Sequence, residues 1–133
     1  MILFSEINWW AVLVGVVATN AFGFLWYGPL FGKQWMNMIG KKPEDIEADP
    51  GMYLKTAFAS LVTMIVLNLV VIHFAPSGFL GGLILGGMVW LGIGATATFV
   101  YTTFEGPPTS VWLLFSIYQF ILYLLMGGVF AIW

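Results

Sequence analysis

Charge is scarce in this chain of 133 residues, which has four Lys or Arg, six Asp or Glu, one His and no Cys. The lack of Cys excludes disulfides, thiolate metal ligands and a thiol nucleophile. All four cations are lysines, and four Lys without Arg cannot make a phosphate-binding face, so nucleic acid is excluded as a partner. The net charge of -2 is too small to indicate an acidic or a basic partner.

Apolar residues make up most of what is present. Hydrophobic residues account for 61% of the chain and its mean hydropathy is +0.98, whereas a soluble domain is nearer 45–50% apolar. Four runs reach the roughly 20 residues that a helix needs to cross a bilayer: 8–27, 53–74, 79–101 and 110–132. We therefore predict an all-α membrane protein, a single domain of four transmembrane helices with membrane lipid around it.

Turn-forming residues separate these runs. Gly28-Pro29 follows the first run, the segment 75–78 makes a hairpin after the second, and 106–108 divides the third from the fourth. Ser5 is the predicted N-cap of the first helix, because its hydroxyl can accept from a free backbone N–H there.

The lysines indicate an orientation, since cytoplasmic loops carry an excess of Lys and Arg. They are Lys33, Lys41, Lys42 and Lys55. We expect loop 28–52 in the cytoplasm and both termini outside. Apolar and polar residues interleave over 31–39, which predicts a short interfacial helix after the first span. Pro43-Glu44-Asp45 predicts a second helix start, with Pro and acidic residues in its first turn.

Small residues recur at helical spacing in two spans. Gly15, Thr19 and Gly23 form a stripe in the first span, and Gly82 and Gly86 form a GxxxG in the third. Such stripes let helix backbones approach closely in lipid. For the first stripe, packing within the chain and contact between copies both remain open. For the third span, close helix packing and local backbone flexibility remain open.

Polar residues at membrane depth are few. Asn20, Thr63, Thr96 and Gln119 fall near one level of the bilayer, and we expect them to form a polar cluster in the bundle interior. We expect Asn20 and Gln119 to approach one another. The cluster either holds the helices together or binds a small ligand.

No set of residues in the sequence points to catalysis. His73 is the only His and stands near the outer end of the second span, so no metal site is expected with it, and no cofactor is expected. The evident candidates for a general base are His73 and Glu105, and the predicted topology puts them on opposite sides of the membrane. Glu105 lies near the inner end of the third span, where we expect it to pair with Lys33. We do not expect an enzyme.

The segment Trp26-Tyr27-Gly28-Pro29-Leu30-Phe31-Gly32-Lys33-Gln34-Trp35 resembles the signature of domain-of-unknown-function family 1761. Three further segments are similar to that family and occur in the same order: Asn8-Trp9, Phe104-Glu105-Gly106 and 126–133. The resemblance implies a small four-span membrane protein, most often bacterial, which would place it in the inner membrane. Pro107 stands where the family often has a basic residue. The resemblance implies no activity.

Two functions fit these observations. In the first, the protein is a non-catalytic structural or accessory subunit of a complex made of its own copies or of other membrane proteins. In the second, a channel or facilitator for a small neutral solute forms between protomers. The direction in which the polar residues point would distinguish the two.

Overall fold

The computed structural model describes residues 4–47 and 49–133, in which every regular element is helical. Four helical segments are long and apolar enough to cross a membrane: Trp9–Leu30, Pro50–Phe74, Gly78–Phe104 and Thr109–Ile132. This confirms the predicted all-α membrane fold with four spans. The spans differ from the predicted ranges by up to three residues at each end.

The first span consists of α1 (Trp9–Leu25) and a π-helical turn, η2 (Trp26–Leu30), and a short 3-10 turn, η1 (Phe4–Glu6), precedes it. Asn8, rather than Ser5, is the N-cap of α1, because its side chain accepts from the Ala11 N–H at 3.1 Å. Pro29 has no N–H to give, so the turn widens and Phe31 N–H reaches back to the Trp26 carbonyl at 2.9 Å.

A short helix after the first span, α2 (Gly32–Ile39), confirms the helix predicted there. It presents Lys33, Gln34 and Asn37 on its exposed side. The predicted second helix start is a single 3-10 turn, η3 (Pro43–Asp45), in which Asp45 accepts from the Lys42 N–H at 2.9 Å.

The second span is α3 (Pro50–Phe74). The third contains α4 (Gly78–Val89), a second π-helical turn, η4 (Trp90–Ala95), and α5 (Thr96–Phe104). The fourth span is α6 (Thr109–Ile132). The hairpin between α3 and α4 forms as predicted, with Ala75 at φ 44° and Gly78 at φ 63° making the reversal.

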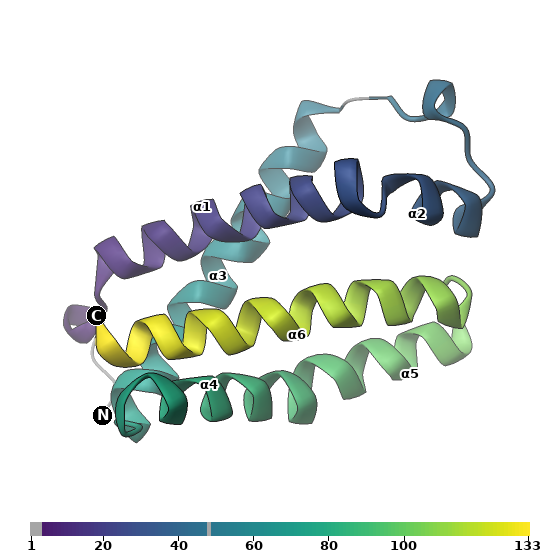
Figure 1. Ribbon diagram of the computed structural model, residues 1–133. Helices are drawn as coiled ribbons and strands as arrows, with labels where there is room; N and C mark the ends of the chain where they lie inside the picture. Colours follow the sequence, from purple (N-terminus) through teal and green to yellow (C-terminus); the bar gives the residue numbers. More distant parts are fainter. Residues whose placement is uncertain (1–3, 48) are drawn as a thin grey trace.

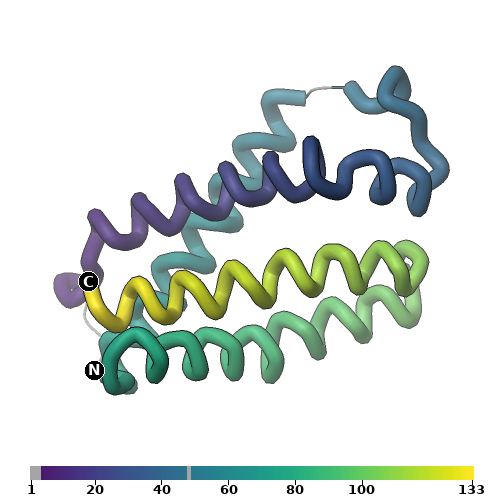
Figure 2. Tube along the Cα trace, in the orientation of Figure 1, coloured from purple at the N-terminus to yellow at the C-terminus, as the bar shows by residue number. Residues whose placement is uncertain are grey.

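The spans run back and forth, so α2 and the α5–α6 turn lie at one end of the molecule, opposite the C-terminus (Figure 1). We call the end with α2 the inner end and the other the outer end. α6 lies along α4 and α5 over its whole length, while the start of α3 diverges from α6 (Figure 2).

Two groups of buried side chains hold the bundle together. The larger group fills the outer half and joins α1, α3 and α6: Ile7, Ala11, Val12, Met64, Leu67, Val71, Leu122, Met126 and Phe130. The smaller group lies at the inner end under α2: Trp26, Leu114 and Tyr118. The inner part of α3 belongs to neither group.

Candidate functional site

Asn20 lies at the middle of the first span and joins α1 to α3. Its side-chain nitrogen donates to the Ser60 hydroxyl oxygen at 3.0 Å and to the Val16 carbonyl at 2.8 Å. Ser60 is only 6% exposed, whereas the Asn20 side chain is open to the surroundings of the bundle. The Asn20 side-chain oxygen accepts no hydrogen bond within residues 4–47 and 49–133.

Tyr118 joins α6 to α1 at Thr19, the residue before Asn20. Its hydroxyl donates to the Thr19 carbonyl at 3.0 Å, and the Thr19 hydroxyl donates to Gly15 at 2.7 Å. Gly23 makes the approach possible, because a Cβ at that position would lie 3.1 Å from the Tyr118 hydroxyl.

Thr63 of α3 lies beside Tyr123 of α6, which places two more hydroxyl groups at this level. Gln119 stands one turn before Tyr123 on α6 and is half-buried. Its amide makes no hydrogen bond to any residue that the structure describes. The middle of the bundle thus holds a row of polar side chains without a formal charge.

The expected pairing of Asn20 with Gln119 is not formed in the described residues. Asn20 turns to Ser60, which is nearer, and α3 then contacts α6 through Thr63. Thr96 also stays outside the row: it is exposed and its hydroxyl donates to the carbonyl of Gly92 on its own helix at 2.9 Å.

The small residues of α4 pack against α6 within the chain. A Cβ on Gly82 would collide with the Gly127 carbonyl oxygen, and one on Gly86 with the Tyr123 carbonyl oxygen. Gly15 similarly gives room to α3, since a Cβ there would lie 2.7 Å from the Met64 sulfur. Of the uses left open by the sequence, these glycines serve packing within the chain.

The Glu105–Lys33 ion pair does not occur in the part of the chain that the structure describes. Both side chains are exposed at the inner end. Glu105 instead ends α5 through its backbone N–H, which donates to the Tyr101 carbonyl at 2.9 Å.

Asn68 is a polar residue whose partner the sequence did not reveal. It is 2% exposed, and its side-chain oxygen accepts from the backbone N–H of Asn8 at 3.0 Å. Asn8 begins the first apolar run, a position at which Asn is a common N-cap, so the capping role of its side chain was open to prediction but the bond to Asn68 was not.

Two buried polar atoms have no hydrogen-bond partner among the described residues, the Trp26 indole nitrogen and the Ser116 hydroxyl. Trp26 lies among aromatic rings, with Phe31 at 4.5 Å and Phe22 at 5.6 Å between centroids. These rings pack against one another, so the cluster is a structural contact beneath α2.

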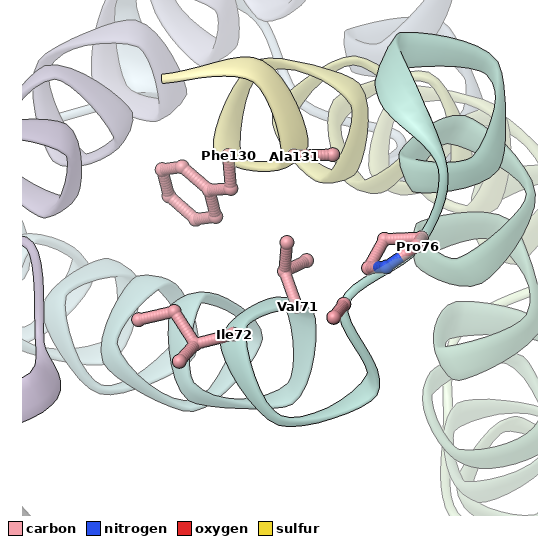
Figure 3. Close-up of a pocket in the computed structure, with 6 residues that line it drawn as sticks. Val71, Ile72, Pro76, Phe130 and Ala131 are labelled. Carbon is pink, nitrogen blue, oxygen red and sulfur yellow. The ribbon is translucent and has the colours of Figure 1, made fainter.

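A hollow of about 240 Å³ opens at the outer end between α3 and α6 (Figure 3). Its lining carries no ionisable side chain: Val71, Ile72, Ala75, Pro76, Phe130 and Ala131. No group of three or more His, Cys, Asp or Glu that could hold a metal ion occurs in residues 4–47 and 49–133. His73 packs edge-on against Phe74, with 5.5 Å between ring centroids.

A family model described as "Protein of unknown function (DUF1761)" matches residues 10–131. The chain belongs to this family, as the sequence resemblance implied. No curated protein and no solved structure matches the chain.

Proposed function

We propose that this member of the DUF1761 family is a non-catalytic subunit that works inside a larger membrane assembly. The observation that carries the proposal is the pair of incompletely bonded amides at mid-depth. Asn20 is exposed with a free side-chain oxygen, and Gln119 makes no hydrogen bond within the described residues. Lipid tails cannot satisfy an amide, so a neighbouring protein that supplies polar partners stabilises this state.

The inner part of the molecule gives further support, because it leaves most of the surface of two helical segments exposed. Residues 50–59 of α3 are exposed except for Gly51 and Ala57, which are half-buried. In α5, every residue is exposed except the half-buried Thr98 and Thr102. Large apolar side chains cover both segments, such as Leu54 at 72% and Phe104 at 82% exposure. A membrane partner can pack on either of them.

The orientation belongs to this proposal. With loop 28–52 in the cytoplasm, the inner end of the bundle is cytoplasmic and both termini lie outside. The two exposed helical segments, residues 50–59 and α5, then lie in the cytoplasmic leaflet, beside the lysine-bearing loop.

Native gel electrophoresis of gently solubilised source membranes tests the proposal. The protein is detected with an antibody against the exposed segment 41–47. We expect it in a band well above the size of one detergent-bound chain. A band at the size of one chain, across several mild detergents, contradicts the proposal.

A passage for a small neutral solute between protomers is the second candidate. It is favoured by the position of the unpaired Gln119 amide beside Thr63 and Tyr123, which makes an uncharged polar surface at mid-depth. Purified protein in liposomes distinguishes the candidates. A subunit without transport leaves the permeability for glycerol and urea at the level of empty liposomes, and a passage raises it.

A further inference from the structure

The side-chain oxygen of Asn20 is a free acceptor that meets no donor among the described residues. A primary amide has two N–H groups and one oxygen with two lone pairs. Both N–H groups of Asn20 are used, one by the Val16 carbonyl and one by the Ser60 hydroxyl. Its oxygen therefore needs a donor from outside, and the side chain is exposed enough to receive one.

Gln119 offers the N–H donors that the side-chain oxygen of Asn20 lacks. Its amide carries two N–H groups, and neither is bonded in the described part of the chain. Gln119 lies close to the middle of α6, and Asn20 lies at the middle of the first span, so the two amides have the same depth in the membrane. Gln119 is half-buried, which leaves it reachable from outside the bundle.

The two amides make no bond to each other within one chain. Asn20 is held by Ser60 of α3, and Tyr123, one turn after Gln119 on α6, lies beside Thr63, one turn further along α3. A pair between them can still form between two chains.

We propose that two copies of this chain associate through reciprocal contacts, in which Gln119 of each copy donates to the Asn20 side-chain oxygen of the other. The inference rests on the proposed function, and it names the partner as a second copy. Two copies inserted with the same topology are related by a rotation about the membrane normal, which preserves depth. A twofold axis then produces two equivalent Asn20–Gln119 contacts, one in each direction.

The surface beside these amides suits such a contact. Residues 50–59, on the inner side of the polar level, diverge from α6 (Figure 2). They expose Met52, Leu54 and Phe58. Lipid can cover these apolar side chains equally well, but it offers no N–H donor at mid-depth. Because a second copy supplies the N–H donor that lipid lacks, we expect a second copy rather than lipid at this surface.

Thiol cross-linking in the membrane tests the contact, and the absence of Cys makes the background clean. Two differently tagged chains are co-expressed, one with Asn20→Cys and the other with Gln119→Cys, and treated with a short bismaleimide. Matched controls carry Val17→Cys and Ile117→Cys, on the same helices at 65% and 45% exposure. We expect a cross-linked dimer carrying both tags from the first pair and several-fold less from the controls. Equal yields from both pairs overturn the inference.

Self-association of the Gln119→Leu variant gives a second readout, because Leu keeps the approximate size and removes the donor. Losing two interhelical polar bonds weakens the dimer by roughly eightfold. Unchanged association of this variant overturns the Asn20–Gln119 contact. If the protein from its source membrane still migrates above one chain, the proposed function stands without this contact. A monomeric wild-type protein in both settings contradicts both.

Discussion

The side-chain oxygen of Asn68 accepts a hydrogen bond from the backbone N–H of Asn8 at 3.0 Å, and this bond ties the outer part of α3 to the start of α1. The Asn8 side chain in turn caps α1 through Ala11. The outer end of the bundle is thus fixed by polar contacts as well as by its apolar core.

Replacing Asn68 by Leu removes the acceptor and leaves the Asn8 N–H unpaired. We expect the free energy of unfolding to fall by about 1–3 kcal/mol, the usual range for a buried donor left unsatisfied. Titration with SDS from mild micelles measures it. Val66→Leu is the matched control, because Val66 is on the same helix and 51% exposed. Equal stability of the two variants contradicts the role of Asn68.

Gly86 and Gly92 lie in the same span but differ in their surroundings. A Cβ on Gly86 meets the backbone of α6 at Tyr123, whereas one on Gly92 meets nothing within 4 Å. We expect Gly86→Ala to lower the melting temperature, with a cost of about 1–3 kcal/mol from overpacking. Gly92→Ala should leave it unchanged or slightly raised. A similar loss in both variants would show that α4 and α6 do not cross at Gly86.

We expect alanine substitutions at two buried serines to have different effects on stability. Ser60 receives a bond from Asn20, so Ser60→Ala should destabilise the protein by about 0.5–1.5 kcal/mol. The Ser116 hydroxyl is 4% exposed and has no partner in the described residues, so Ser116→Ala removes an unsatisfied group and should be neutral or stabilising. The same SDS titration compares them. Destabilisation by Ser116→Ala that equals that by Ser60→Ala contradicts the assignment.

The orientation is testable with single cysteines and a membrane-impermeant maleimide. Lys42→Cys and Glu105→Cys should react only from the cytoplasmic side, because loop 28–52 and the α5–α6 turn share the inner end (Figure 1). Ser77→Cys, in the α3–α4 hairpin, should react only from the outer side. If Glu105 and Ser77 react from the same side, the four-span topology is wrong. If each of the three cysteines reacts from the side opposite to the one predicted, only the orientation is wrong.

The spans and their connections could be predicted from the sequence because hydrophobic length and turn residues are local signals. The α3–α4 hairpin and α2 follow from such signals. The N-cap could not be chosen with the same ease, because Ser5 and Asn8 both precede the first span and only the η1 turn separates them.

The partners of the polar residues could not be predicted, because they depend on how helices rotate and cross. Sequence spacing gave the depth of Asn20 and Gln119 correctly for their own helices. It did not show that Ser60, a small residue in an apolar run, would accept from Asn20 while its own hydroxyl donates to the Ala57 carbonyl. Thr96 shows the same limit, since the η4 turn alters the facing of α5.

The mass of the intact complex is the most direct test of whether the protein works inside a larger membrane assembly. The protein is extracted from its own membrane in a mild detergent, and native mass spectrometry counts every chain that remains with it. We expect a complex that contains more than one membrane protein chain, with at least two copies of this 14.7 kDa chain if the Asn20–Gln119 contact forms. A single chain carrying only lipid and detergent, under conditions that preserve known complexes of the same membrane, would contradict it.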